Sequence, residues 1–287
     1  MLKNMTSLFP YSMIQRRKTL LLIGEEYKDL LVQLGIEDFE AFLKKHGQTS
    51  PHLRGRTPLL SIDLGTGEKM VVRHYTHGGL LRLLTRDLYL FGSRSFQELA
   101  LTEEIRSAGI PTVQPIGAVH HRVFPCFYKA YLMSLEIPQS RDAAKYLLET
   151  GPHPSREGLI KKRTVIRSAG RLVLQFHRSG FFHSDLQLKN ILVAGDVPHL
   201  IDFDRSYRKA GLTLREKVSN LLRLNRSIEK WKRLGLPLTR TDRWRFFLAY
   251  SGGDPEVREA LRKRLRTNGI RFCAHRWMWT LQKYFGK

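Results

Sequence analysis

Residues 182–193 carry polar side chains at a spacing suited to phosphoryl transfer. The stretch contains His183, then Asp185 two residues later and Asn190 five after that, and Asp202 follows twelve residues further on. In phosphoryl transfer one Asp must meet the acceptor hydroxyl. An Asn at the far end of the same loop must reach a metal, and a second Asp must return to that metal. The spacing is therefore typical of a phosphate-transfer loop rather than of a merely solvated one.

The patterns around these residues indicate elements that could position them. A helical pattern begins at Ser155, repeats apolar residues at 159, 166 and 173, and ends at Gly180. Two short apolar runs, 191–193 and 199–201, flank the turn 194–196 and predict a small hairpin. From Thr213 onward the pattern is helical to the end of the chain.

Upstream, the hydrophobic period changes. Residues 58–75 alternate apolar and polar side chains around a Gly-Thr-Gly turn, which predicts a β-hairpin. Ser95 to Glu98 have the spacing of a capping box, so we expect a helix from there to Gly109. Strand-like sequence follows at 114–123 and 126–137. The first fifty residues show two short amphipathic helical patterns, at 27–34 and 37–45.

These motifs together identify a family resemblance. Residues 183–193 and 200–206 resemble the catalytic core of lipopolysaccharide core kinases, the family of the Kdo kinases. Kdo is the acidic octulosonic sugar attached to lipid A. Segments 72–75, 94–98, 109–111 and 221–230 match the family in the same order, so the resemblance covers about 54–230. It implies an α+β, protein-kinase-like bilobal fold, with a helical extension (1–50), a small β-rich N-lobe (51–137) and a mostly helical C-lobe (138–287).

The resemblance implies roles for the loop residues. Asp185 resembles the catalytic Asp, which accepts or orients the sugar hydroxyl as it attacks the γ-phosphate of ATP. Asn190 and Asp202 resemble the Mg²⁺ ligands, because hard oxygens suit a hard cation. His183 is a further candidate at the catalytic loop, although a buttress of the backbone is the better interpretation. Ser184 cannot form a hydrolase relay with its two neighbours in one loop.

The small lobe should bind the nucleotide. Arg73 stands where kinases carry a lysine, with Lys69 on the same strand face as the reserve candidate. Glu98 is expected to hold that cation, although its place three residues after Ser95 also suits a capping box. The loop over the phosphates is expected at 53–57, with Gly55 and Arg56 as its candidate residues.

Departures from protein kinases bear on the acceptor. Gln187 stands where protein kinases usually have Lys, and Asp204 stands where they have the Gly of Asp-Phe-Gly. The segment 205–211 leads almost directly into the next helix, so little platform remains for a peptide. The sequence therefore favours the hydroxyl of a small molecule or glycolipid, and the resemblance to the Kdo kinases implies the 4-hydroxyl of Kdo in Kdo-lipid A.

The charge is strongly positive. The 287 residues include 49 Lys or Arg and 26 Asp or Glu, which gives a formal charge of +23, and the pI is about 10.4. Residues 205–287 hold 22 basic and 6 acidic residues, so this segment carries +16. Such a field favours phosphate-rich partners, here an anionic membrane surface and an anionic glycolipid. With two cysteines, no long apolar run and no signal peptide, the expected location is the cytoplasmic face of the inner membrane of a Gram-negative bacterium.

Other functions remain open at this point. Within the same fold the acceptor could be a core heptose or another small molecule, although a cationic antibiotic suits a +23 protein poorly. From another class, the chain could be a nucleic-acid-binding protein with a vestigial kinase loop. Its charge permits this, but no zinc finger, helix-turn-helix or aromatic ribonucleoprotein motif accompanies it, so nucleic acid is an unlikely partner.

Overall fold

The computed structural model describes residues 10–46, 48–54, 58–76, 87–252, 255 and 258–263. The chain divides into two compact units. The first comprises 1–140 and 199–207, and the second comprises 141–198 and 208–287. The chain therefore passes between the units three times, after residues 140, 198 and 207. Asp202 belongs to the first unit, while Asp185 and Asn190 belong to the second.

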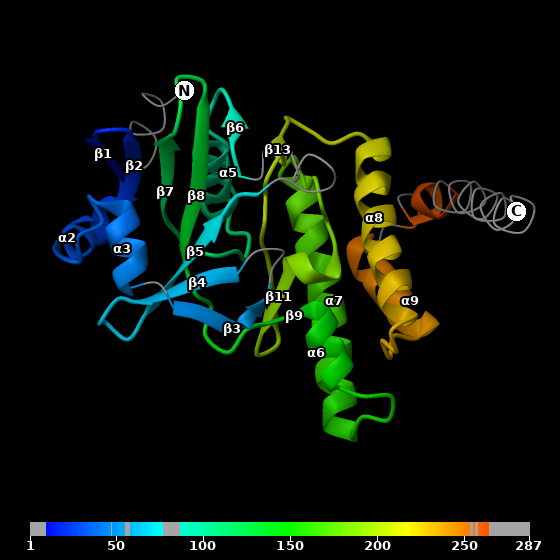
Figure 1. Ribbon diagram of the computed structural model, residues 1–287. Coiled ribbons are helices and arrows are strands. Elements are labelled where there is room, and N and C mark those ends of the chain that lie inside the picture. The colour runs from blue at the N-terminus through cyan, green and yellow to red at the C-terminus, as the bar shows by residue number, and fades with distance from the viewer. Residues whose placement is uncertain are drawn as a thin grey trace, which may run out of the picture. The chain divides into compact units, whose positions relative to one another are not determined.

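The first unit is built on an antiparallel sheet (Figure 1). Its order is β1-β2-β7-β8-β5-β4-β3, and β6 also pairs with β8. The strands are β1 (Tyr11–Arg16), β2 (Thr19–Gly24), β3 (Gln48–Arg54), β4 (Pro58–Asp63), β5 (Lys69–His74), β6 (Tyr89–Leu90), β7 (Pro115–Arg122) and β8 (Phe127–Leu135). The predicted hairpin is confirmed by the β4–β5 register, in which Leu60 pairs with Val72 and Asp63 with Lys69.

The N-terminal segment differs from the expected helical extension. Its two predicted helices are present as α2 (Glu25–Gln33) and α3 (Phe39–His46), but β1 and β2 precede them and join the sheet. Strand β2 pairs with β7, with Leu21 opposite Val119. The two backbones approach so closely that a Cβ on Gly117 would lie 2.3 Å from the carbonyl oxygen of Leu22. Glycine at 117 is therefore required by the fit of β2 against β7.

Both faces of this sheet are covered, because its strands carry apolar side chains on alternate faces. One core cluster joins Ile62, Met70 and Val72 of the sheet to Leu31 of α2 and Phe42 of α3. The other cluster joins apolar residues of the opposite face to helix α5 (Arg94–Ser107); its members include Leu22, Phe96, Leu99, Tyr128, Ala130 and Leu132. Helix α5 is therefore held rigidly against the strands that carry the candidate site.

The capping-box interpretation of Ser95 is wrong. The N-cap of α5 is Ser93, whose side chain makes no capping hydrogen bond, and Ser95 lies inside the helix. The hydroxyl of Ser95 instead donates to the carbonyl oxygen of Val119 at 3.0 Å. Because the helix begins after Ser93, Glu98 does not occupy the position of a capping-box residue. The predicted end of the helix is confirmed by Gly109, which follows the C-cap Ala108 with φ +69°.

The second unit is mostly helical. Its helices are α6 (Ala143–Glu149), α7 (Arg156–Arg178), η1 (Leu188–Asn190), α8 (Leu214–Lys232) and α9 (Arg240–Tyr250). Its short strands are β9 (Arg141–Asp142), β10 (Phe181–Phe182), β11 (Ile191–Ala194), the start of β12 (Val197–Leu200) and the end of β13 (Tyr207–Arg208). The predicted long helix is confirmed as α7, with Ser155 as its N-cap and Gly180 (φ +82°) after its end.

Helices α7 and α9 pack closely against each other. A Cβ on Gly170 would lie 2.5 Å from the carbonyl oxygen of Phe246, so only glycine permits this approach. The buried side chains of Lys162 and Asp242 form an ion pair at 3.1 Å across the same interface. Among the described residues, no helix combines the length and the low polarity needed to cross a bilayer.

Candidate active site

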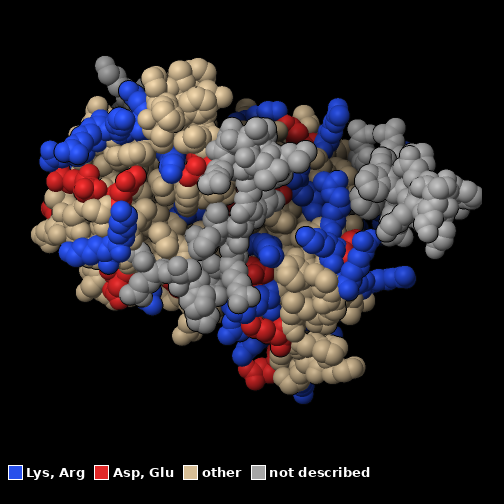
Figure 2. All heavy atoms as spheres, in the orientation of Figure 1, with Lys and Arg blue, Asp and Glu red and all other residues tan. Residues whose placement is uncertain are grey.

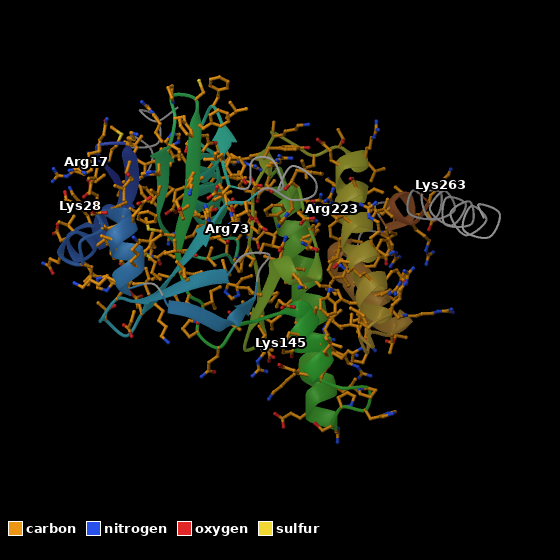
Figure 3. All side chains as sticks on the ribbon, viewed as in Figure 1. Arg17, Lys28, Arg73, Lys145, Arg223 and Lys263 are labelled. Carbon is orange, nitrogen blue, oxygen red and sulfur yellow. The ribbon has the colours of Figure 1, made fainter. Side chains whose placement is uncertain are left out.

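Arg73 is the centre of a charged cluster in the first unit. It lies on β5, and Figure 3 shows it within the sheet. Its Nη2 forms an ion pair with Glu98 of α5, and its Nη1 forms one with Asp202. Nη2 also donates to the hydroxyl of Tyr75 at 2.9 Å, and the guanidinium lies 4.6 Å from the centre of the Tyr75 ring. The three partners use the planar fork of an arginine, which a lysine does not provide.

Glu98 uses both oxygens of its buried carboxylate. Oε2 binds Arg73 and accepts a hydrogen bond from the Tyr75 hydroxyl, and Oε1 accepts one from the backbone N–H of Phe203 at 2.9 Å. The side chain is 2% exposed. Burial raises the pKa of Glu98 from 4.5 to about 7, and the positive charge of Arg73 opposes that rise. The same burial would lower the pKa of Arg73, but the carboxylates of Glu98 and Asp202 raise it above its usual value.

The segment 202–206 forms a tight turn beside this cluster. Asp202 adopts φ +66° and Arg205 adopts φ +58°, which are left-handed conformations uncommon for residues other than glycine. The backbone N–H of Ser206 donates to the carbonyl oxygen of Phe203 at 2.8 Å. Arg94, at the start of α5, holds Asp204 through both carboxylate oxygens. Helix α5 thus fixes the turn twice, through Glu98 and through Arg94.

Asp185 lies in the loop before η1 in the second unit. Its Oδ2 accepts a hydrogen bond from Nε2 of Gln187 at 2.8 Å, and its Oδ1 accepts one from Nη1 of Arg223 at 3.0 Å. The Asp185 side chain is 41% exposed. A carboxylate held at both oxygens yet open to solvent can orient an incoming hydroxyl without first having to be ordered.

The buried side chain of His183 supports this loop. The residue is fully buried, and its Nδ1 accepts a hydrogen bond from the backbone N–H of Asp185 at 3.1 Å. Asn220 of α8 binds the backbone of His183 on both sides, since its Oδ1 accepts from the N–H at 3.1 Å and its Nδ2 donates to the carbonyl at 2.9 Å. The geometry favours the buttress interpretation of His183.

Asn190 ends the loop. Its Nδ2 donates to the carbonyl oxygen of Asp185 at 2.9 Å, which shapes the loop and leaves the amide oxygen as the end available to a cation. Asp202 offers a partly exposed carboxylate that binds a positive group, the guanidinium of Arg73. Each of these residues, taken singly, presents a hard oxygen of the kind that Mg²⁺ prefers, so its chemistry fits the ion. No cluster of three or more His, Cys, Asp or Glu side chains suited to a metal occurs among the described residues.

Some predicted site residues are not brought to the Arg73 cluster. Lys69 shares a strand face with Arg73 but is exposed, and no ion pair in the described part of the chain includes it. Gly55 and Arg56 lie outside the described residues. The basic residues 264–287 of the C-terminal segment lie outside them as well.

Three contacting residues were missed by sequence reasoning: Tyr75, Asn220 and Arg223. Tyr75 lies two residues after Arg73 on the same side of the extended chain, a spacing that could have indicated the contact. Asn220 and Arg223 lie on a helix thirty or more residues after the loop that they contact, and no local pattern connects them to it.

Comparisons with known proteins identify the family. Residues 40–250 match the model of the lipopolysaccharide kinase (Kdo/WaaP) family. A 3-deoxy-D-manno-octulosonic acid kinase of Vibrio cholerae is 34% identical over 182 residues, which cover 62% of this chain and 71% of that protein. The enzyme of the same name from Actinobacillus succinogenes is 32% identical over 219 residues, which cover 72% and 86%.

A solved structure shows the same fold. The chain described as WaaP in complex with acyl carrier protein superposes with a TM-score of 0.57 and 21% sequence identity, covering 92% of this chain and 98% of that one. The expected protein-kinase-like α+β fold is thereby confirmed.

Proposed function

This chain belongs to the lipopolysaccharide kinase (Kdo/WaaP) family, and from that premise we propose that it uses ATP to phosphorylate Kdo, at its 4-hydroxyl, in the inner core of lipopolysaccharide. The activity is a kinase activity with a sugar hydroxyl as acceptor. The observation that carries the proposal is the contact of Arg73 with both Glu98 and Asp202, in a chain whose relatives are named as kinases of this sugar.

The first unit supplies the nucleotide-binding groups. Arg73 would hold phosphate oxygens of ATP, because a guanidinium binds phosphate through paired N–H groups. Glu98 positions that guanidinium through one oxygen and the Asp202 turn through the other. Lys69, Gly55 and Arg56 remain candidates for further contacts with the phosphates. In this proposal the first unit acts as the N-lobe and the second unit as the C-lobe.

We assign Asp202 and Asn190 as the oxygen ligands of Mg²⁺, which when bound neutralises charge on the phosphates. Arg73 binds the Asp202 carboxylate in the structure, so Asp202 would be shared between the guanidinium and a bound cation. A kinase metal needs only one or two carboxylate or amide ligands, since phosphates and water complete its shell.

Asp185 acts on the acceptor. One carboxylate oxygen accepts the hydrogen bond of the sugar hydroxyl and orients its oxygen toward the γ-phosphorus. As the new O–P bond forms and the bond to the ADP oxygen breaks, the hydroxyl proton passes to Asp185. His183 fixes the backbone N–H of Asp185, and Asn220 fixes the backbone of His183, so both are positioning residues.

The acceptor class accounts for the charge of the protein. Kdo-lipid A carries carboxylates and phosphates, and α8 alone carries six Lys or Arg residues against two Glu. A glycolipid acceptor requires access to a membrane, and we assign the protein to the cytoplasmic face of the inner membrane as a peripheral protein. Basic residues near anionic lipids favour that association.

A direct assay tests the proposal. Full-length protein is incubated with ATP, Mg²⁺ and Kdo-lipid A, and the product is analysed by mass spectrometry and fragmentation. One added phosphate on the 4-position of Kdo is expected, with one ADP released for each product. Phosphate found on a heptose of a longer core acceptor, or no transfer by folded protein, would overturn it. If the protein instead bound nucleic acid tightly with a steep salt dependence and turned over no ATP, the binding-protein alternative would replace it.

A further inference from the structure

We infer, within the proposed function, that Arg223 binds the carboxylate of the acidic sugar acceptor. Arg223 lies on α8, as labelled in Figure 3, and its Nη1 donates to Oδ1 of Asp185 at 3.0 Å. The two side chains are 42% and 41% exposed, so the pair faces solvent. Among the described residues, Asp185 is the only hydrogen-bond partner of the Arg223 guanidinium. Most of the guanidinium fork is thus open to a ligand beside the catalytic carboxylate.

The contacts of Asp185 explain why the ligand should be an anion. Gln187 lies on the same loop and holds Oδ2, whereas Arg223 reaches Oδ1 from another element. An acceptor hydroxyl that donates to Oδ1 competes with Arg223 for that oxygen. The guanidinium remains charged at any working pH and needs another acceptor. A carboxylate on the same sugar ring as the hydroxyl would supply two oxygens that match the fork.

The charges along α8 favour an anion at this place. Between 217 and 231 the only acidic residue is Glu229, and Arg243 pairs with it at 2.6 Å. Ser227, one turn after Arg223, accepts a hydrogen bond from the backbone N–H of Leu188 at 3.2 Å, so this face of the helix contacts the loop. The ammonium of Lys189 lies 5.5 Å from the centre of the Trp231 ring on the same side. A carboxylate beside Arg223 therefore meets a positive surface.

A substrate comparison tests Arg223 directly. The ratio of kcat/KM for a Kdo glycoside to kcat/KM for its carboxyl methyl ester is measured in the wild type, Arg223→Ala and Arg223→Lys. The wild type should prefer the acid. Arg223→Ala should lower kcat/KM for the acid by about tenfold to a hundredfold and bring the ratio near one. Arg223→Lys keeps the charge but not the fork and should restore part of the ratio.

A control variant and two contrary outcomes complete this test of Arg223. Arg215→Ala removes an exposed arginine at the start of α8 and should leave the ratio unchanged. If Arg223→Ala lowered kcat/KM equally for the acid and for its methyl ester, Arg223 would only position Asp185 and the inference would be wrong. If the folded wild type phosphorylated neither compound, the proposed function itself would fail.

A separate observation, on the first unit, supports a second inference: we propose that an apolar tip inserts into an anionic membrane. The tip patch consists of Leu90, Phe91, Phe124, Pro125 and Cys126. Leu90, Phe91 and Phe124 are 57%, 73% and 59% exposed, and Cys126 is exposed too. The two turns form one surface, because the N–H of Phe91 donates to the carbonyl of Cys126 at 3.2 Å.

The backbone at Phe91 is unfavourable for its side chain. Phe91 adopts φ +48° and is followed by Gly92 at φ +74°. A bulky residue in the left-handed region costs free energy, and Asn would fit there with less strain. Since Phe91 is the most exposed of the large apolar residues described, packing does not compensate for that cost. A partner outside the protein that binds the Phe91 side chain would compensate for it.

Positive charge beside the tip patch identifies the partner as an anionic lipid surface. The turn of Arg17 and Lys18 lies against the end of β7, since the N–H of Arg122 donates to the carbonyl of Lys18 at 2.8 Å. Residues 105–135 contain no Asp or Glu. Figure 2 shows uncharged surface at the top of the first unit with Lys and Arg beside it. Apolar side chains with flanking cations bind the boundary between headgroups and acyl chains.

Vesicle binding without ATP or acceptor tests the tip patch. Full-length protein is sedimented with vesicles of phosphatidylcholine alone or with added phosphatidylglycerol. Binding should require phosphatidylglycerol, and Phe91→Asn with Phe124→Ser should weaken it by at least about tenfold. Met13→Ser, which removes an apolar side chain of 54% exposure elsewhere in the unit, should leave it unchanged.

Labelling identifies the surface that enters the membrane. In Cys273→Ser protein, a polarity-sensitive dye on Cys126 should shift to shorter wavelengths on vesicles that contain phosphatidylglycerol. Binding without a shift, or equal binding by the tip and Met13 variants, would overturn the inference. Activity on detergent-dispersed Kdo-lipid A should be retained by the tip variant, so failure of membrane insertion and failure of the kinase proposal give different results.

Discussion

Glu98 accepts the backbone N–H of Phe203 with one carboxylate oxygen and binds Arg73 with the other. One buried side chain thereby joins α5, the sheet and the turn that carries Asp202. Protein kinases use a helix glutamate to hold the cation of the nucleotide phosphates. Here the cation is an arginine and the glutamate also holds the turn, so the cation and the proposed metal ligand are held by the same carboxylate-centred cluster.

The raised pKa of Glu98 gives a pH prediction. Burial raises the pKa from 4.5 to about 7, so the folded protein retains a proton that the unfolded chain loses above pH 4.5. The free energy of unfolding of the wild type should therefore fall, relative to Glu98→Gln, as pH rises from 4.5 to about 7. Urea denaturation of both proteins at several pH values measures the difference. Parallel curves would show that Glu98 titrates with an ordinary pKa.

Replacement of Arg73 by lysine should impair nucleotide binding. A lysine keeps the charge but cannot bind Glu98, Asp202 and phosphate through a planar fork, so kcat/KM for ATP should fall by about tenfold to a hundredfold. Lys69→Met on the same strand tests the reserve candidate for the phosphates, whose exposed side chain should cost less than Arg73→Lys. A larger loss in the Lys69 variant than in the Arg73 variant would reverse these assignments.

Asp185 should be required for transfer but not for folding. Asp185→Asn keeps the shape of a partly exposed side chain, so the melting temperature should stay near that of the wild type. Loss of the proton acceptor should lower kcat by at least about a hundredfold. Asp196→Asn, in an exposed turn of the same unit, serves as the control in both measurements. Retained activity in the Asp185 variant would refute its proposed role.

Asn220 should stabilise the protein through the catalytic loop. Asn220→Ala leaves the buried N–H and carbonyl of His183 without their partner and removes the bond to Nε2 of His177. The free energy of unfolding should fall by about 2–4 kcal/mol. Asn225→Ala, on the same helix but exposed, should change it by less than about 0.5 kcal/mol. Chemical denaturation distinguishes the two results.

Local sequence patterns predicted much of the scaffold. Helix α7 follows from its apolar period and its Ser155 and Gly180 boundaries, and the β4–β5 hairpin follows from alternation around a glycine turn. Strand β2 was missed because Leu21 and Ile23 enter one core cluster and Leu22 the other. A short apolar run buried on both faces shows no period that separates strand from helix.

The candidate site likewise contains residues that the sequence indicated and residues that it did not. The spacing of Asp185, Asn190 and Asp202 is local enough to be recognised in the sequence. The role of Glu98 was obscured by Ser95, because a capping pattern does not reveal that a hydroxyl will bond to a neighbouring strand. Asn220 and Arg223 contact the loop across more than thirty residues, and such pairs arise only from packing of α8.

The close approach of β2 to Gly117 bears on how the protein can be shortened. A recombinant fragment that starts after α3 would keep every proposed site residue yet lose the two strands that pair beyond β7. The uncovered amide and carbonyl groups of β7, beside newly exposed apolar residues such as Ile116 and Val119, would template intermolecular strand pairing. Such a fragment should aggregate on expression, so mutagenesis of this enzyme needs its N-terminal strands.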